Sequence, residues 1–144
     1  MNESKFVPAA RFSFLTNYFD ILCSAIGLGK KYRIKTIDML GRLSEGSKIL
    51  DAGCGTGSLS IMIKKKYPKI ALHAIDIDKK ILQIAHRKSI EKNLIIMFKQ
   101  AQIQRLPYPD SYFDVAYSSL VFHHLKTQDK ILAAREIYRV IKKD

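Results

Sequence analysis

One segment constrains the fold of this chain more than any other: residues 51–57 carry Gly53, Gly55 and Gly57, a glycine at every second position. Two apolar residues, Ile49 and Leu50, precede this segment, and residues 58–67 after it have helical spacing. The pattern predicts a buried strand that enters a tight turn and continues into a helix. Glycine permits such a turn and lets a ligand approach the main chain, because no Cβ is in the way. Unpaired N–H groups at the helix start make the segment a candidate ligand-binding loop.

The spacing of the glycines separates this loop from the dinucleotide-binding fingerprint. That fingerprint is G-x-G-x-x-G, whereas residues 53–57 read G-x-G-x-G. The tighter loop suits a nucleoside with a compact amino-acid tail better than it suits a pyrophosphate. The spacing therefore disfavours a nicotinamide-dependent oxidoreductase.

Strand and helix patterns alternate along the rest of the chain. Strands are predicted at 48–50, 70–75, 94–98 and 113–117, and helices at 58–67, 78–92 and 127–141. This alternation predicts an α/β fold, a parallel sheet with helices on both faces and right-handed crossovers. Two more helices, at 12–26 and 30–43, are predicted before the first strand, separated by a Gly-Leu-Gly turn at 27–29.

Polar residues follow the second and third predicted strands. Asp76 ends the second strand, 19 residues after Gly57, where an acid can accept both ribose hydroxyls of a nucleoside lying across the strand ends. The alternative is a helix cap, a role assigned here to the neighbouring Asp78. After the third strand, Gln102 is expected to reach an adenine amine and Ile103 to pack on the adenine ring.

The end of the fourth strand and the histidines that follow it are weaker signals. Ser118 and Ser119 are expected near the amino-acid part of the ligand. His123 and His124 are adjacent, and neighbouring residues on a helix do not face one another, so no metal site is expected. A substrate or catalytic role for either histidine stays open, and the catalytic residue stays unknown.

Composition limits the class of protein. The 144 residues are 47% hydrophobic and 26% charged, which is typical of one globular domain. No apolar run reaches the 18 to 20 residues of a membrane span, and no signal-peptide pattern is present at the start. We expect a cytoplasmic protein, with Cys23 and Cys54 as reduced thiols.

The net charge of +12 raises nucleic acid or an anionic membrane surface as partners. The lysines are scattered over predicted helix surfaces and ends, where solvated positions are usual. This distribution disfavours nucleic acid and leaves peripheral membrane contact open.

Four segments together resemble a known family, the class I S-adenosylmethionine-dependent methyltransferases. Residues 49–57 resemble the family's first motif, and residues 106–115, 120–125 and 135–142 are similar to segments of the ubiquinone- and menaquinone-biosynthesis branch. The resemblance implies a Rossmann-like fold and S-adenosylmethionine as the cofactor. The cofactor-binding residues expected are Asp51, Gly53, Cys54, Gly55, Thr56, Gly57, Asp76, Ile77, Gln102, Ile103, Ser118 and Ser119. Among these, the resemblance assigns Asp51, Gly53, Thr56 and Gly57 to the methionine tail.

The sequence departs from the family in two places. Many relatives have Asp where this chain has Gln102, so the hydrogen bond expected between the adenine amine and this side chain lacks the strengthening effect of a charged acceptor. Relatives also continue beyond the segment at 139–142 with three more strands, in the order 3-2-1-4-5-7-6, whereas the sequence ends at Asp144. We therefore expect strands 3-2-1-4 only, and an exposed fourth-strand edge that favours self-association.

The resemblance implies that the chain has two regions with different roles. Residues 1–45 are expected to form N-terminal helices that cover the cofactor and substrate site, and residues 46–144 the cofactor-binding domain. The expected activity is methyl transfer to a small-molecule or lipid-like acceptor. The alternative is a truncated cofactor-binding or interaction module without turnover.

Overall fold

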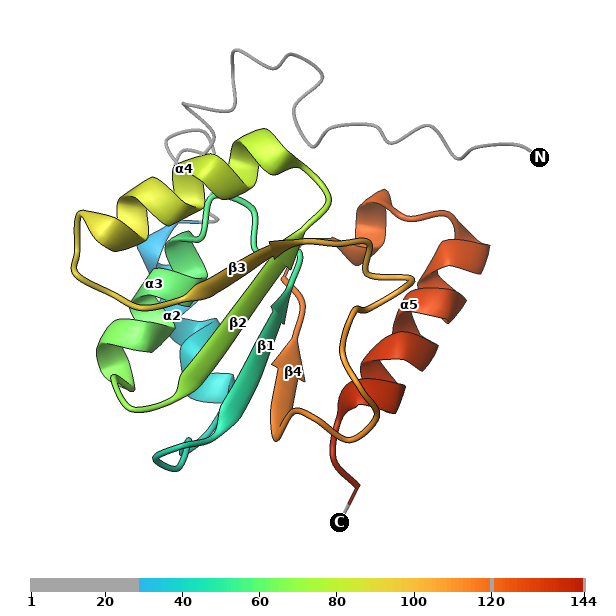
Figure 1. Ribbon diagram of the computed structural model, residues 1–144, viewed down its shortest axis with the longest axis horizontal. Coiled ribbons are helices and arrows are strands. Elements are labelled where there is room, and N and C mark those ends of the chain that lie inside the picture. The colour runs from blue at the N-terminus through green and yellow to red at the C-terminus, as the bar shows by residue number, and fades with distance from the viewer. Residues whose placement is uncertain (1–28, 120, 144) are drawn as a thin grey trace.

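The computed structural model describes residues 29–119 and 121–143 (Figure 1). The elements in chain order are α2 (Lys30–Met39), β1 (Lys48–Ala52), α3 (Ser58–Lys66), β2 (Ala71–Asp76), α4 (Lys79–Ile90), β3 (Met97–Gln100), β4 (Val115–Tyr117), the 3₁₀ turn η2 (Phe122–His124) and α5 (Thr127–Val140). The helix predicted at 12–26 lies outside the described residues. Within the described ranges, no helix is long and apolar enough to cross a membrane.

The four strands form one parallel sheet in the order β3-β2-β1-β4. This is the predicted order. The strands are short, and β1 is almost wholly buried while β2 alternates between buried and partly buried residues, with helices on both faces of the sheet. The fold class is therefore α/β and Rossmann-like, as predicted.

Two apolar clusters lie on opposite faces of the sheet. On one face, α2 and α3 pack against alternate strand residues such as Ile49 and Leu72. On the other, α5 packs through Ala133 and Val140 against Leu50. Figure 1 shows α2 and α3 behind the sheet and α5 beside β4. The alternation of Ile49 and Leu50 between the two clusters follows from the two-residue period of a strand.

Most element boundaries lie within one or two residues of the prediction, and three differences have a clear structural setting. The helix predicted at 30–43 ends at Met39, because Gly41 takes a left-handed φ of 68°. The strand predicted at 94–98 is Met97–Gln100 instead, since the chain turns at Asn93 and the Leu94 N–H bonds back to the Ser89 carbonyl. The strand predicted at 113–117 is shortened to Val115–Tyr117.

The residues just before β4 make contacts that were not predicted. Phe113 lies beside Ile141 as an isolated parallel bridge, and the Lys142 N–H donates to the Phe113 carbonyl at 2.8 Å. The outer edge is thus covered where the chain enters β4. Along β4 itself, no described strand pairs on the side away from β1.

Candidate functional site

The glycine loop at the end of β1 is shaped by the neighbouring strand β2. The N–H groups of Gly53 and Cys54 both donate to the Ile75 carbonyl at 2.8 Å. The next N–H, that of Gly55, donates to Asp76 Oδ2 at 2.9 Å. Three successive main-chain donors therefore bond to the last two residues of β2, and the loop closes over the carboxyl ends of both strands.

All three glycines of the loop have the left-handed backbone that favours glycine, but their surroundings differ. A Cβ on Gly53 (φ 86°) would lie 2.1 Å from Val121 Cγ2, and one on Gly57 (φ 72°) would lie 2.9 Å from Ala85 Cβ. A Cβ on Gly55 (φ 54°) would meet no described atom within 4 Å. Gly53 and Gly57 are thus required by packing, whereas Gly55 faces open space beside Asp76.

Asp76 organises the loop and the start of the following helix. Its Oδ1 accepts the Asp78 N–H at 3.0 Å, in addition to the Gly55 bond to Oδ2. Burial raises the pKa of Asp76, while the bonds from Asp78 and Gly55 lower it. Asp78 caps α4 as predicted, since its side chain accepts the N–H groups of Lys80 and Ile81. Asp76 is left half-buried with a carboxylate at the strand ends.

Asp51, the acid that ends the β1 approach to the loop, lies in the core and is 1% exposed. Its Oδ2 accepts a short hydrogen bond from the Ser60 hydroxyl on α3. Burial raises the pKa of Asp51 to about 7, against the lowering effect of the Ser60 and Tyr117 hydroxyls. Because the Asp51 carboxyl is buried, a ligand has little direct access to it, whereas the half-buried Asp76 carboxyl is more accessible.

The loop after β3 separates two predicted neighbours. Gln102 is exposed, and its carbonyl accepts the Arg105 N–H at 3.1 Å. Ile103 is only 6% exposed and packs in the α5-side cluster with Leu50. Ile77, at the end of β2, is half-buried and its carbonyl accepts Gln100 Nε2 at 2.9 Å.

The serines after β4 bind to two different elements. Ser118 Oγ donates to the Ala52 carbonyl at 2.7 Å, which joins the ends of β4 and β1. Ser119 Oγ lies 3.2 Å from the hydroxyl of Tyr32 on α2. The described part of the N-terminal segment therefore reaches the same end of the sheet as the glycine loop.

Four residues of this region were missed by the sequence reasoning. Val121 packs on Gly53, and Tyr32 contacts Ser119. Lys88 Nζ, from α4, donates to Ser58 Oγ at 2.6 Å at the start of α3. Tyr117 lies beside Asp51 with a buried hydroxyl. Each is distant in sequence from its partner, so no local pattern marks these contacts.

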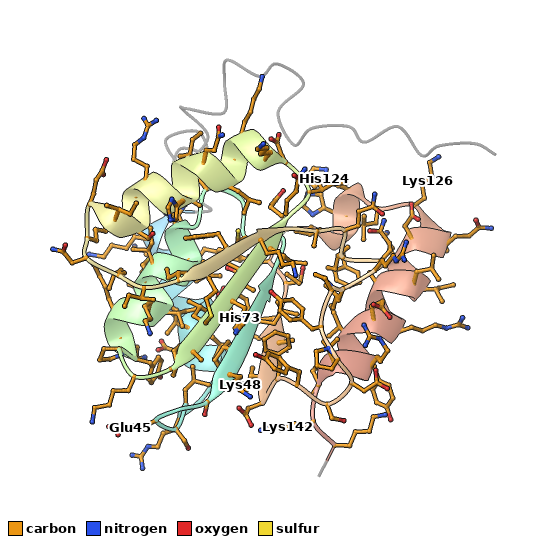
Figure 2. All side chains as sticks on the ribbon, in the orientation of Figure 1. Glu45, Lys48, His73, His124, Lys126 and Lys142 are labelled. Carbon is orange, nitrogen blue, oxygen red and sulfur yellow. The ribbon has the colours of Figure 1, made fainter. Side chains whose placement is uncertain are left out.

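The remaining candidates lie at the edge of the site. The rings of His123 and His124 are 3.9 Å apart between centroids, and both are exposed. His124 lies at the carboxyl end of the sheet, whereas His73 lies over its face (Figure 2). Across residues 29–119 and 121–143, no group of three or more His, Cys, Asp or Glu side chains is placed to hold a metal ion. The cysteine of the loop, Cys54, is a free thiol whose pKa is raised by desolvation.

A guanidinium holds the loop between β3 and β4 against α5. Arg139 donates to both carboxylate oxygens of Glu136 at 2.8 Å and to the carbonyls of Tyr108 and Leu106 at 2.8 and 3.0 Å. It also contacts Asp110 at 2.8 Å, and Glu136 accepts the Leu106 N–H at 2.7 Å. This network orders the segment that leads from the predicted adenine loop to β4.

Comparisons with known proteins agree with this geometry. The model of a methyltransferase domain matches residues 49–144. The chain is 30% identical over 132 residues to a demethylmenaquinone methyltransferase of Thermus thermophilus, covering 90% of this chain and 59% of the relative. It is 30% identical over 149 residues to a ubiquinone/menaquinone biosynthesis C-methyltransferase of Rickettsia bellii, covering 98% and 58%. The chain therefore spans less than two thirds of the length of these relatives.

Solved structures are similar over most of the chain. A Methanococcus maripaludis protein, provisionally described as an S-adenosyl-L-methionine-dependent methyltransferase, matches with a TM-score of 0.77 and 25% identity over 99% of this chain and 64% of that one. An Aquifex aeolicus S-adenosylmethionine-dependent methyltransferase matches with a TM-score of 0.67 and 26% identity, covering 76% and 58%. The family-model match over residues 49–144, together with the shared fold, shows that this chain belongs to the methyltransferase domain family.

Proposed function

We propose that this chain binds S-adenosylmethionine at the carboxyl ends of β1 and β2 and takes part in methyl transfer to a small-molecule or lipid-like acceptor. The observation that carries the proposal is the glycine loop, which is bonded to the end of β2 and has open space at Gly55 beside the Asp76 carboxylate. A loop without a Cβ there admits a nucleoside next to an acid that can accept its ribose hydroxyls. Membership of the methyltransferase domain family supports the same assignment.

The residues fit the parts of this cofactor. Asp76 keeps lone pairs for two ribose hydroxyls after accepting the Gly55 and Asp78 N–H groups, because a carboxylate has about four acceptor positions. The main chain of the loop at 53–57 approaches the methionine tail, and Asp51 acts on it from beneath the loop. The predicted adenine neighbours are Ile77, Gln102 and Ile103, of which Ile103 is mostly committed to the core.

Methyl transfer from a sulfonium is an in-line displacement, so the protein must align the reacting atoms and exclude water. Ser118 and Ser119 are proposed to line the methyl-donor end, where Ser118 joins β4 to β1. The contact between Ser119 and Tyr32 supports α2 as part of the cover over the site. We extend this proposal to the division of the chain, with residues 1–45 as the cover and 46–144 as the cofactor domain.

The names of the relatives suggest the acceptor class. Two of them are a demethylmenaquinone methyltransferase and a ubiquinone/menaquinone biosynthesis C-methyltransferase. We therefore propose an aromatic, quinone-precursor-like acceptor.

Two further proposals concern partners. The net charge of +12 favours binding of the protein to an anionic membrane surface, and flotation with anionic and with neutral vesicles measures this binding. The unpaired side of β4 favours self-association, which sedimentation velocity measures.

Calorimetric titration with S-adenosylmethionine tests the proposal, and two glycine variants sharpen it. Gly55 and Gly46 both have positive φ, and a Cβ on either would meet no described atom within 4 Å. Both Gly55→Ala and Gly46→Ala should therefore lose about 1 kcal/mol of stability through backbone strain. Only Gly55→Ala should lose cofactor binding, because only its Cβ projects into the proposed site. Equal binding by both variants, or no binding by the folded wild type, contradicts the proposal.

A further inference from the structure

Three polar side chains from three elements meet beneath the glycine loop. Asp51 belongs to β1, Ser60 to α3 and Tyr117 to β4, and their side chains are buried. Ser60 donates its hydroxyl to Asp51. Tyr117 is opposite Asp51 in the β1–β4 register and close enough to influence its pKa. These groups form what we name the buried acid cluster: Asp51, Ser60 and Tyr117.

Among the described residues, no cation compensates the charge of the Asp51 carboxyl. The titratable groups that face Asp51 are Tyr117 from β4, Asp76 from β2 and the loop thiol Cys54. None of these groups carries a positive charge, and the negative charge of Asp76 opposes ionisation of Asp51. Burial and this repulsion raise the pKa of Asp51 to about 7. Without a ligand, the protonated and ionised forms of Asp51 therefore coexist at neutral pH.

The Tyr117 hydroxyl is the unexplained member of the cluster. It is fully buried beside the Asp51 carboxyl and the Ser60 hydroxyl, yet in the part of the chain that the structure describes it makes no well-formed hydrogen bond. An unsatisfied buried hydroxyl costs free energy, so such groups usually serve a second state or a bound molecule. Of the nearby acceptors, the ionised Asp51 carboxylate is the strongest, because it is charged and has lone pairs beyond the one used by Ser60.

We propose that Tyr117 is a positioning residue for the cofactor: its hydroxyl donates to the Asp51 carboxylate when a cationic ligand lies over the loop, so that binding releases the Asp51 proton to solvent. The proposal rests on the proposed function. S-adenosylmethionine carries a sulfonium and an ammonium group against a single carboxylate. Its net positive charge at the end of β1 favours the ionised acid, and the ionised acid in turn favours the cofactor.

The reciprocity of linkage gives the size of the effect. A group with a pKa of about 7 in the free chain that stays ionised in the complex makes affinity rise about tenfold from pH 6 to pH 8 and level off above. At pH 7 about half a proton leaves per cofactor bound. Affinity rises with pH because the ligand binds the ionised form of Asp51, which predominates above the pKa of the free chain.

The experiment is calorimetric titration of the full chain with S-adenosylmethionine at pH 7, in phosphate and in a buffer of high ionisation enthalpy, repeated from pH 6 to 8. Wild type should release about half a proton at pH 7. Asp51→Asn should bind with no proton release and no pH dependence. Tyr117→Phe should bind about tenfold more weakly at pH 7.5, because the ionised acid loses a donor.

Thermal unfolding separates a positioning role from a structural one. Without cofactor, Tyr117→Phe should melt at or above the temperature of wild type, because the removed hydroxyl makes no well-formed hydrogen bond among the described residues. The matched control is Tyr67→Phe, which removes a hydroxyl bonded to the Gly41 carbonyl at the far end of α3 and should leave affinity unchanged. Binding without proton release, or unchanged affinity in Tyr117→Phe, overturns this inference alone. Absence of any binding overturns the proposed function and this inference together.

Discussion

The close approach of Val121 to Gly53 predicts a large and repairable cost for Gly53→Ala. The new Cβ would lie 2.1 Å from Val121 Cγ2, a separation that packed carbon atoms do not reach. The positive φ of 86° adds strain of about 1–2 kcal/mol. Overpacking typically costs a further ~1–3 kcal/mol. We therefore expect Gly53→Ala to lower the free energy of unfolding by about 2–5 kcal/mol.

A second substitution distinguishes the two contributions. Val121→Ala removes the atoms at 2.1 and 3.3 Å and leaves only its own Cβ at 3.2 Å. In the double variant the severe overlap is removed and only the tight 3.2 Å contact and the backbone strain remain, so a favourable coupling of about 1–3 kcal/mol is expected. Urea unfolding followed by circular dichroism gives the four free energies of this double-mutant cycle. Additive effects, or a cost of Gly53→Ala no greater than that of Gly55→Ala, would refute the assigned contact.

Two more predictions concern the regions around the site. Arg139→Lys should lower the free energy of unfolding, measured with urea, by about 1–3 kcal/mol, because an ammonium cannot replace the guanidinium that binds Glu136 and the carbonyls of Leu106 and Tyr108. The exposed control Arg135→Lys should change this free energy by no more than ~0.5 kcal/mol. Equal effects of the two substitutions would contradict the role assigned to the Arg139 network. Asp114 accepts from Lys142 Nζ and the Lys48 N–H at 2.7 Å, at the opposite end of the sheet from the loop, and these bonds lower its pKa (Figure 2). The contribution of Asp114 to folding stability is therefore present above its ordinary pKa of 3.8 and lost as pH falls through the lowered pKa. The melting temperatures of wild type and Asp114→Asn should accordingly converge as pH falls from 6 to 2.5. A difference in melting temperature that stays constant over this range would contradict this assignment.

The arrangement of the sheet was predictable because local patterns determine it. The alternation of apolar strands and amphipathic helices predicted a parallel sheet, the family resemblance predicted the strand order, and Asp78 at the start of α4 was correctly predicted as a cap. The third strand was placed too early, because Leu94 and Ile95 have the apolar character of a strand. The Leu94 N–H is still bonded to the Ser89 carbonyl in the turn at Asn93, which the apolar pattern did not indicate.

The site was predictable in its backbone and less so in its side chains. The glycine spacing identified the loop, and its bonds to the end of β2 follow from parallel pairing. The resemblance assigned Asp51 to the ligand, yet the carboxyl is buried against Ser60 on α3. Tyr117 meets Asp51 across 66 residues of sequence, a distance at which periodicity carries no information. The cofactor-binding functions of the individual residues stay predictions until they are tested by titration.

The three bonds from the glycine loop to Ile75 and Asp76 have a consequence for evolution and for engineering. The conformation of residues 53–55 is not encoded in the loop alone, since the acceptors that fix it belong to the next strand. A transplanted glycine motif would keep its shape only in a recipient sheet that supplies a carbonyl and a carboxylate at the same register. Any residue supplies the carbonyl, so among the residues at the end of β2 it is the side chain of Asp76 whose substitutions should covary with those in the loop.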